Sequence, residues 1–343
     1  MSSSFPFSSC LAVDVGFGNT KAVWGHKPSI DGDDMWSEIC FRSVAPKIWG
    51  AEQSGLNTAD RVKINVAGQQ FWVGPGAHVT GVEDGVIEQS GKNIETSEYQ
   101  ALIAGAWAYM IANSGTDQRS IDTLVLGLPV SGFKANRERL IQIGGKVFTV
   151  PLPNRTDISV VAKKVEVYPQ PYGAFITAST SNSSLTSSDR SVLVLDPGYS
   201  TMDWFLIENG QIRLEQCDSF EGGMSTLLAA VATRISQDTG NGSPSFGLIE
   251  AGLRRGNMVI GRNRIDMGPY NAVIRQQADA VIREFLRRFE PARFGVTDIV
   301  LAGGAAPYFE QSLRTMLPAY KIHCMQNSVM SNARGFYLAG IDK

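Results

Sequence analysis

Cysteine is scarce in this 343-residue chain, and its few cysteines lie far apart. They are Cys10, Cys40, Cys217 and Cys324. Because no two of them form a Cys-x-x-Cys pair, the sequence indicates neither a zinc site nor a disulfide framework, and it fits a reducing, cytoplasmic compartment. Histidine is also scarce, with isolated residues at positions 26, 78 and 323. An isolated histidine is weak support for a functional motif, so we expect a structural role for each.

Long apolar runs and an excess of positive charge are also lacking. No segment reaches the roughly 18 apolar residues that cross a membrane. Residues 2–10, SSSFPFSSC, have no basic start, so we expect a disordered leader rather than a signal peptide. The formal net charge is −2, which provides no basic field for nucleic acid. The sequence therefore predicts a protein that binds neither a membrane nor nucleic acid directly.

The most informative stretch runs from Ser191 to Gly210 and reads SVLVLDPGYSTMDWFLIENG. An apolar run ends at Asp196, a Pro-Gly turn and two small hydroxyl residues follow, and a second apolar run ends at Asn209-Gly210. This pattern predicts two strands joined by a turn, with a hairpin turn after the second. Such a turn exposes backbone N–H groups and hydroxyls to an anion, while the carboxylate faces a metal or a water.

A similar stretch lies near the N-terminus, where Leu11 to Gly25 reads LAVDVGFGNTKAVWG. Asp14 corresponds to Asp196, and Gly16 corresponds to Gly198. One Asp-x-Gly turn is weak support for a function, because most such turns are only turns. Two copies, in a chain long enough for two domains, indicate an internal duplication with two phosphate-binding hairpins that face one cleft.

Periodicity and turn residues predict the other elements of the chain. Extended segments are expected at residues 41–48, 63–66, 70–73, 121–128, 146–151, 157–167 and 297–301. Helices are expected at 97–114, 134–144, 173–179, 226–237, 271–288, 309–317 and 331–341, with loops at 179–188 and 238–245. The helix over 97–114 is expected to be amphipathic and capped by Ser97. The two prolines between Tyr168 and Gly173 predict an extended approach to the next helix.

Two further segments each allow two interpretations. Arginines on the predicted 271–288 helix form either a solvated face or an interaction patch. They are Arg275, Arg283, Arg287 and Arg288. Gly303-Gly304 connects a predicted strand to a helix, which is either a plain connection or a place where a flat base or an α-phosphate packs against bare backbone.

These motifs resemble those of the actin superfamily. Asp14 to Lys21, DVGFGNTK, is similar to its first phosphate motif, and Asp196 to Asp203, DPGYSTMD, is similar to its second. Leu301 to Ala305, LAGGA, resembles the adenosine motif. Tyr168 to Ala174 and Asn332 to Gly335 resemble the two connecting segments. The five motifs occur in the order of the family and span nearly the whole chain.

Within the superfamily, the chain most resembles the ParM/StbA plasmid-segregation ATPases, and among them the ParM-like protein D of PRTRC plasmid systems. Five short segments carry this narrower resemblance. They are SVAP at 43–46, VGP at 73–75, SEY at 97–99, AL at 101–102 and LGLPV at 126–130.

The resemblance implies an α/β, actin-like ATPase fold with two ribonuclease-H-like domains flanking a nucleotide cleft. Domain I would comprise residues 1–170 and 331–343 with the first phosphate hairpin. Domain II, residues 171–330, would carry the second hairpin and the adenosine motif. The resemblance also implies an ATP hydrolase whose copies polymerise into filaments, and filaments that move plasmid DNA through a DNA-binding adaptor protein. ATP is the expected nucleotide, with GTP left open.

The resemblance also implies roles for single residues. Asp14 and Asp196 would hold Mg²⁺, largely through its waters, and Gln170 would orient the attacking water. These three are the expected catalytic residues, although Gln170 is alternatively a turn residue between prolines. Lys21 would neutralise charge on the β- and γ-phosphates. The other residues expected to bind the nucleotide are Gly16, Phe17, Gly18, Asn19, Gly198, Tyr199, Ser200, Thr201, Glu221, Gly222, Gly223, Gly303, Gly304 and Ala305.

Two other functions stay open at the level of sequence. Pro197 departs from the family pattern and removes one backbone N–H near the phosphates, which favours a non-polymerising ATP-binding scaffold. A small-molecule kinase of the same superfamily would need an aspartate that deprotonates the acceptor hydroxyl. Asp122 precedes a buried strand and Asp157 starts one, so neither is a convincing general base.

Overall fold

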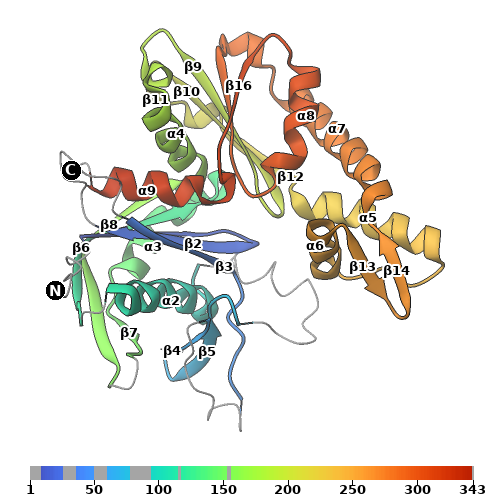
Figure 1. The fold of residues 1–343 in the computed structure, drawn as a ribbon. Coiled ribbons are helices and arrows are strands. Elements are labelled where there is room, and N and C mark those ends of the chain that lie inside the picture. Colours follow the sequence, from blue (N-terminus) through green and yellow to red (C-terminus); the bar gives the residue numbers. More distant parts are fainter. Residues whose placement is uncertain are drawn as a thin grey trace, which may run out of the picture. The chain divides into compact units, whose positions relative to one another are not determined.

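A computed structural model describes residues 9–25, 36–49, 60–77, 94–114, 117–152 and 156–341. His26, His78, the leader at residues 2–8 and most of the acidic loop after Pro28 lie outside the described residues. The chain divides into two compact units. Unit 1 comprises Met1–Thr177 and Met330–Lys343, and unit 2 comprises Ala178–Val329 (Figure 1). In the chain, α4 (Gln170–Ser181) runs from the first unit into the second.

Unit 1 is built on a six-stranded mixed sheet. Its strands, in spatial order, are β3 (Trp36–Arg42), β2 (Asn19–Gly25), β1 (Cys10–Val15), β6 (Ser120–Leu128), β8 (Ile158–Pro169) and β7 (Phe148–Val150). β1 runs antiparallel to β2 and parallel to β6, and β6 runs parallel to β8. The predicted first hairpin and the strands near 121–128 and 157–167 are confirmed. The extended segment predicted at 41–48 is confirmed in part: β3 ends at Arg42, and further on Lys47 forms an antiparallel bridge with Phe71.

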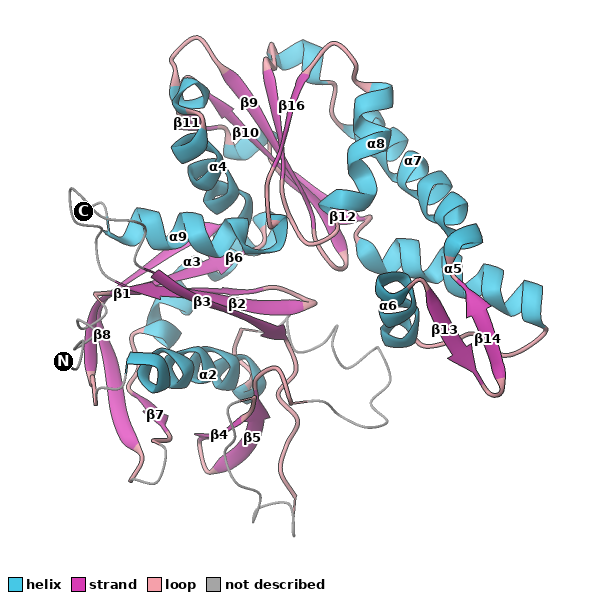
Figure 2. Ribbon diagram, in the orientation of Figure 1, coloured by secondary structure: helices cyan, strands magenta, loops and turns pink. Residues whose placement is uncertain are grey.

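Helices cover both faces of this sheet (Figure 2). α2 (Ser97–Ser114) packs on one face, and α9 (Ser331–Ile341) packs on the other. Alternate side chains of β1 point to opposite faces of the sheet, as expected of a strand. Leu11 faces the α2 core, whereas Cys10 lies against α9, where a Cβ on Gly340 would come within 2.5 Å of its sulfur.

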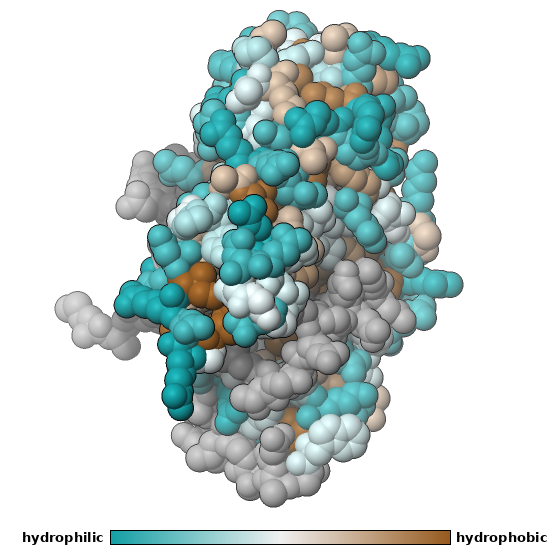
Figure 3. Space-filling view, turned by 90° about the vertical axis from the view of Figure 1, so that its right-hand side faces the viewer, coloured by the Kyte–Doolittle hydropathy of each residue, from teal (hydrophilic) through white to brown (hydrophobic). Residues whose placement is uncertain are grey.

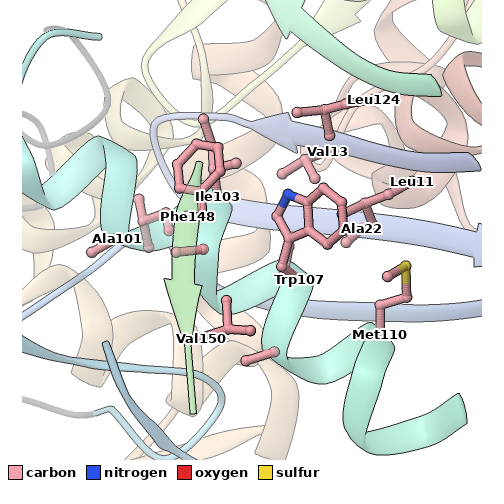
Figure 4. Packing of buried hydrophobic residues seen from close by; sticks show 14 of the residues in the cluster. Leu11, Val13, Ala22, Ala101, Ile103, Trp107, Met110, Leu124, Phe148 and Val150 are labelled. Atoms are coloured by element: carbon pink, nitrogen blue, oxygen red, sulfur yellow. The ribbon is translucent and has the colours of Figure 1, made fainter. Parts of the chain in front are cut away.

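The predicted bounds of α2 are confirmed, but its predicted amphipathic character is wrong. Its residues are buried all around the helix from Ala101 to Ile111, because α2 lies between the sheet and a hairpin of β4 (Val62–Val66) and β5 (Gln69–Val73). Figure 4 shows the Trp107 indole directed toward the sheet residues Leu11 and Ala22. The cap is also corrected: the N–H of Tyr99 donates to the Thr96 hydroxyl at 3.2 Å, one residue before the expected Ser97.

The remaining elements of unit 1 are a hairpin, the helix that follows β6, and the start of α4. The hairpin consists of β4 (Val62–Val66) and β5 (Gln69–Val73), close to its predicted strands, and its turn residues Ala67 and Gly68 both have positive φ, 52° and 83°. α3 (Val130–Gly144) begins directly after Pro129, four residues earlier than the sequence indicates. Proline sets a φ that suits the residue before a helix, so it starts this helix rather than delaying it.

The predicted extended approach to α4 is confirmed as far as Pro169, where β8 ends, but the predicted start of the helix at residue 173 is wrong. The helix begins at Gln170, so Pro171 lies in its first turn, where a missing N–H costs no helical hydrogen bond. Further along, α4 crosses α9 at Gly173 and Gly335. A Cβ on Gly335 would come within 1.8 Å of the Gly173 carbonyl oxygen, so the two helices touch through their backbones.

Unit 2 has a second mixed sheet. Its strands, in order, are β11 (Gln211–Ile212), β10 (Thr201–Glu208), β9 (Ser191–Pro197), β15 (Asp298–Leu301) and β16 (Lys321–Cys324), with β12 (Asp218–Glu221) also paired to β10. The predicted hairpin and the strand near 297–301 are confirmed, but the latter is not the last strand. β16 is a short edge strand without an apolar run. Its His323 lies 2.8 Å from the buried Asp298, which supports a structural role for this histidine.

Four helices and a small hairpin complete unit 2. They are α5 (Met224–Thr239), α6 (Phe246–Arg255), β13 (Asn257–Ile260), β14 (Asn263–Asp266), α7 (Asn271–Arg288) and α8 (Ala306–Met316). Short 3-10 helices are η2 (Ser183–Thr186), η3 (Leu214–Gln216), η4 (Gly268–Tyr270), η5 (Pro291–Phe294) and η6 (Ser328–Met330). The helices predicted near 226–237, 271–288 and 309–317 are confirmed. α6, β13 and β14 were not predicted, and η2 occupies part of the expected 179–188 loop.

Candidate functional site

The first hairpin positions a buried carboxylate at the end of β1. Asp14 is completely buried, and the turn that follows is closed by the Gly16 N–H, which donates to the Asn19 carbonyl at 3.1 Å. Gly18 lies buried inside the turn, where its carbonyl accepts the Ser43 N–H at 3.1 Å, and Phe17 is half-buried. The predicted phosphate residues therefore form one ordered turn beside Asp14.

Two donors from different elements meet on the Asp14 carboxylate. Lys21 Nζ donates to Asp14 Oδ2 at 2.8 Å from the facing strand β2. Gln170 Nε2 donates to Asp14 Oδ1 at 2.6 Å from the first turn of α4. Both contacts are shielded from water, because Gln170 is buried and only 13% of the Lys21 side chain is exposed. The charge of Asp14 is therefore compensated within the protein.

The second hairpin has the same outline but different surroundings. Asp196 ends β9, and the Gly198 N–H closes the turn by donating to the Thr201 carbonyl at 2.8 Å. The start of α5 wraps around this turn: the N–H groups of Met224 and Ser225 donate to the Gly198 and Tyr199 carbonyls at 3.0 and 2.7 Å. Those N–H groups are thus already used by the protein.

The Glu221-Gly222-Gly223 segment, predicted to reach the ribose, lies against the same turn. The N–H groups of Gly222 and Gly223 both donate to the Ser200 carbonyl, at 3.2 and 3.1 Å. A Cβ on Gly223 would come within 2.6 Å of the Tyr199 oxygen. Close packing of the two backbones therefore explains the glycines at these positions without any ligand. The Glu221 side chain is exposed.

A second carboxylate, which sequence reasoning did not assign to the site, faces Asp196. Asp203 lies directly opposite Asp196 in the β9–β10 ladder, and both side chains are buried. Burial, followed by the charge of Asp196, raises the pKa of Asp203 to about 7. The Thr201 hydroxyl donates to Asp203 Oδ2 at 3.4 Å. The signal was available, because aligning Asp14 with Asp196 also aligns Lys21 with Asp203.

Two polar atoms of this hairpin have no hydrogen-bond partner among the described residues. They are the Ser200 hydroxyl and Asp203 Oδ1, and both belong to buried side chains. A buried polar atom without a partner is costly unless something bound supplies one. The chemistry of the set fits an anionic phosphate, which accepts from a hydroxyl, and a hard cation, which takes carboxylate oxygens.

The predicted adenosine turn also packs on the second hairpin. Gly303 has a φ of +81°, and a Cβ there would come within 2.2 Å of Asp196 Oδ1. Ala305 holds the same junction, since its N–H donates to the Pro197 carbonyl at 3.0 Å. Gly304 is exposed, so this part of the turn is open to a ligand. Unit 2 thus brings the predicted second phosphate turn and the predicted adenosine turn together.

The residues considered as kinase bases do not resemble catalytic groups. Asp122 is exposed and pairs with Lys163 Nζ at 2.8 Å, and Asp157 is exposed as well. Among the described residues, no group of three or more His, Cys, Asp or Glu side chains could hold a metal alone. No helix in that part of the chain is both long enough and apolar enough to span a membrane.

Two family models match successive parts of the chain. The model for the N-terminal domain of actin-like proteins matches residues 12–173, and that for the C-terminal part of the archaeal actin homologue MreB-like matches residues 194–315. The chain has an actin-like ATPase fold. Both matches include one of the two predicted phosphate hairpins, and the second also includes the predicted adenosine turn.

Solved structures show the same fold over almost the whole chain. Ta0583, an archaeal actin homologue, has a TM-score of 0.77 and 19% identity, with 96% of this chain and 98% of that chain covered. A ParM from a 15-stranded Clostridium botulinum filament has a TM-score of 0.74 and 17% identity, with the same coverage. Ta0583 also has a solved complex with ADP. A search of curated protein sequences finds no match.

Proposed function

We propose that this actin-like protein is an Mg²⁺-dependent ATPase that polymerises into filaments and drives plasmid or DNA segregation. It would act in the cytoplasm through a DNA-binding adaptor protein. Its motifs resemble the ParM/StbA group, in particular protein D of PRTRC plasmid systems. Support for self-association comes from related folds, because the C. botulinum ParM and Alp12 structures are filaments.

The observation that carries the proposal is the contact between Gln170 and Asp14. Its amide nitrogen is occupied by the Asp14 carboxylate at 2.6 Å, which leaves Gln170 Oε1 as an acceptor for a water. A neutral amide suits this task, since phosphoryl transfer depends more on the position of the water than on a strong base. The hydrogen bond fixes the side chain before a nucleotide arrives, and such preorganisation lowers the barrier.

The charged residues of both hairpins fit magnesium and phosphate. We propose that Asp14 and Asp196 hold Mg²⁺ mainly through its waters, because both oxygens of Asp14 already accept hydrogen bonds. The metal, when bound, would neutralise charge on the phosphates. Lys21 supplies a fixed positive charge at the first turn, and the Ser200 hydroxyl supplies an unused donor at the second.

The remaining predicted contacts follow from the backbone of each turn. In the first hairpin, we propose that the turn from Gly16 to Asn19 surrounds a phosphate through its glycines and its backbone N–H groups. In the second, Gly198 to Thr201 do the same. The open backbone at Gly304 is the proposed contact for the base or ribose, with Gly303 and Ala305 holding the turn in place.

Cosedimentation with phosphate release tests the proposal. The purified chain would be incubated with Mg-ATP, Mg-GTP or a non-hydrolysable ATP analogue, then centrifuged while phosphate is measured. The proposal expects pelleting with ATP and with the analogue, and phosphate only with ATP. Phosphate release that needs an added acceptor would instead indicate a kinase.

A second function, an ATP-binding scaffold that hydrolyses poorly, is favoured by one observation. Pro197 has no N–H, and its carbonyl accepts from Ala305, so this residue offers the phosphates no donor. Nucleotide binding without phosphate release or pelleting would support the scaffold. Pro197→Gly would then increase phosphate release if the missing donor is the cause.

A further inference from the structure

One half-buried ion pair of unit 1 joins the edge strand of the sheet to the last helix. Arg334 of α9 donates from Nε to Glu38 Oε2 at 2.8 Å and from its terminal nitrogen to Glu38 Oε1 at 2.7 Å. The two side chains are 23% and 28% exposed, and the residues lie 296 positions apart in the chain. Two parallel hydrogen bonds fix the direction of the guanidinium as well as its distance. The pair therefore ties β3 to α9 in one defined geometry.

A charged pair on the surface carries no argument by itself. Figure 3 shows one face of the molecule, on which hydrophilic side chains predominate among the coloured residues. Arg234 and Asp238, for example, form an exposed pair within α5. Such pairs contribute little to the free energy of folding. The pair of Arg334 and Glu38 differs because it joins two separate elements, so its role depends on what those elements hold.

The face of the sheet under α9 carries the side chains of the first predicted phosphate hairpin. Asp14 lies directly opposite Lys21 in the β1–β2 ladder, and Lys21 lies opposite Cys40 of β3. Side chains directly opposite one another in a ladder share a face of the sheet. Cys10, on the same face of β1 as Asp14, lies against α9. Glu38 shares the face of Cys40 on β3, so α9 covers the face that carries both Asp14 and Glu38.

The α9 side chain two residues after Arg334 lies beside the Asp14 carboxylate. A Cβ on Gly127 of β6 would come within 2.5 Å of the Phe336 ring and within 3.2 Å of Asp14 Oδ1. The ring and this oxygen therefore border the same small space, and Oδ1 is the oxygen that accepts from Gln170. Phe336 is completely buried. A shift of α9 would therefore move a side chain that lies next to the contact between Asp14 and Gln170.

The helix that carries Gln170 also lies directly on α9. Gly335 and Gly173 are in backbone contact where the two helices cross, and Gly173 lies about one helical turn after Gln170. A Cβ on Gly173 would come within 2.3 Å of the Asn332 carbonyl oxygen, so no side chain separates the helices there. Close-packed backbones cannot shift independently of one another. The position of α9 therefore fixes the first turn of α4.

We propose that Arg334 is a positioning residue: its ion pair with Glu38 holds α9 in place, and α9 holds the Gln170 amide on Asp14. This inference rests on the proposed function in one respect, the role of Gln170 in orienting the attacking water. Arg334 acts through Gln170 and performs no step of the reaction. Without the ion pair, α9 and the first turn of α4 sample more positions, and the amide leaves Asp14 more often. Such misplacement slows a reaction even when the changed residue is distant from the reacting atoms.

Hydrogen exchange of the Gln170 side-chain amide tests the positioning without a nucleotide. Its NMR signals are assigned by their loss in Gln170→Ala, and they should exchange slowly because the amide donates to the buried Asp14. Arg334→Met should speed this exchange by about tenfold. Glu38→Gln, a milder change that removes the pair from the strand side, should do the same, and the double variant should add little. Wild-type exchange in both folded variants would overturn the proposal.

Lys47→Met is the matched control for loss of an ion pair. Lys47 Nζ pairs with a Glu98 oxygen at 3.3 Å, and these side chains are 39% and 27% exposed. The pair also joins separate segments of unit 1, but Glu98 belongs to α2, which packs on the opposite face of the sheet from α9. Lys47→Met should leave the exchange within about twofold of wild type. An equal increase in Lys47→Met and Arg334→Met would contradict a specific role for Arg334.

A double-mutant cycle tests the consequence for phosphate release. Arg334→Met should slow single-turnover release about tenfold and change nucleotide affinity by less than about threefold. In a Gln170→Ala background the same change should slow release by less than about twofold, because the residue through which Arg334 acts is gone. Arg334→Lys keeps the charge without the planar fork and should recover part of the rate. Equal effects of Arg334→Met in both backgrounds would overturn the proposal.

The two measurements distinguish failure of this inference from failure of the proposed function. If the wild-type protein releases no phosphate but Arg334→Met speeds exchange of the Gln170 amide, the ATPase is rejected and the hold of α9 on Gln170 stands. If the wild-type protein releases phosphate and the exchange is unchanged in Arg334→Met, the positioning role is rejected alone.

Discussion

The two predicted phosphate hairpins share one backbone plan but differ in the residue that faces the aspartate. In each, a buried aspartate ends the first strand and a glycine N–H closes the turn. The facing residue is Lys21 opposite Asp14, and Asp203 opposite Asp196. The first hairpin therefore pairs its carboxylate with a cation, whereas the second places two carboxylates side by side.

The difference indicates that the two hairpins have different roles in the proposed site. The Asp14 carboxylate is held by Lys21 and Gln170, so the first hairpin is ordered and electrically balanced before any ligand binds. The second hairpin has excess negative charge and an unpartnered Ser200 hydroxyl. Such a site gains more from a bound cation and phosphate. We infer that the first hairpin positions groups and that the second responds to the ligand.

Removing the carboxylate of the second hairpin should have the largest effect. Asp196→Ala should lower the rate of phosphate release by about 1,000-fold, since the proposed metal loses a carboxylate that no neighbour replaces in the same place. The assay is steady-state phosphate release at saturating Mg-ATP, with the exposed Asp189→Ala as control. Turnover within about threefold of wild type would contradict the assignment of Asp196.

Removing the cation of the first hairpin should make it resemble the second. Lys21→Met leaves the completely buried Asp14 with a single donor, and breaking a buried ion pair costs about 3 kcal/mol of folding free energy. Urea unfolding measures this change. Lys163→Met, which removes an exposed pair with Asp122, is the control and should cost less than about 0.5 kcal/mol. Equal losses of folding free energy in the two variants would show that the buried Asp14 pair stabilises the protein no more than an exposed ion pair.

Removing the amide that α4 directs at the first hairpin should separate hydrolysis from binding. Gln170→Ala should slow phosphate release about 100-fold while nucleotide affinity changes by less than about threefold, because Gln170 is proposed to act on the water alone. Single-turnover phosphate release measures the rate of hydrolysis, and titration with a fluorescent nucleotide measures the affinity. A parallel loss of both would instead indicate that Gln170 shapes the nucleotide site through Asp14.

Neutralising the second carboxylate should give the smallest effect, one that depends on pH. Burial raises the pKa of Asp203 to about 7, so the folded state holds a proton that the unfolded state releases near pH 4. Stability from this group is complete below the unfolded pKa and is lost as pH rises through about 7. Asp203→Asn should therefore raise Tm by about 3 °C above pH 7, and by less near pH 5. A Tm difference that is independent of pH would contradict this titration.

Local sequence signals predicted the β1–β2, β4–β5 and β9–β10 hairpins and most helices. Asn209 and Gly210 indeed form a two-residue turn with φ values of 53° and 72°, as an Asn-Gly pair between apolar runs indicates. The bounds of α2, α7 and α9 were also readable, because each has a long helical pattern with clear ends. Fold class followed from the order of five motifs rather than from any single element.

What sequence could not predict depends on contacts between distant residues. α2 is buried all around because other strands cover its second face, and no pattern within the helix states this. β16 is short and half-exposed, and it becomes a strand only by pairing with β15. The contact between Gln170 and Asp14 joins residues far apart in the chain. The helix α6 and the β13–β14 hairpin were not predicted either, although they are part of unit 2.

Light scattering recorded together with phosphate release, after Mg-ATP is added to the purified chain, tests the central claim most directly. The account predicts that scattering rises only above a critical concentration and decays as phosphate accumulates, since hydrolysis would destabilise the polymer. Phosphate release with flat scattering at every protein concentration would contradict a filament-forming ATPase.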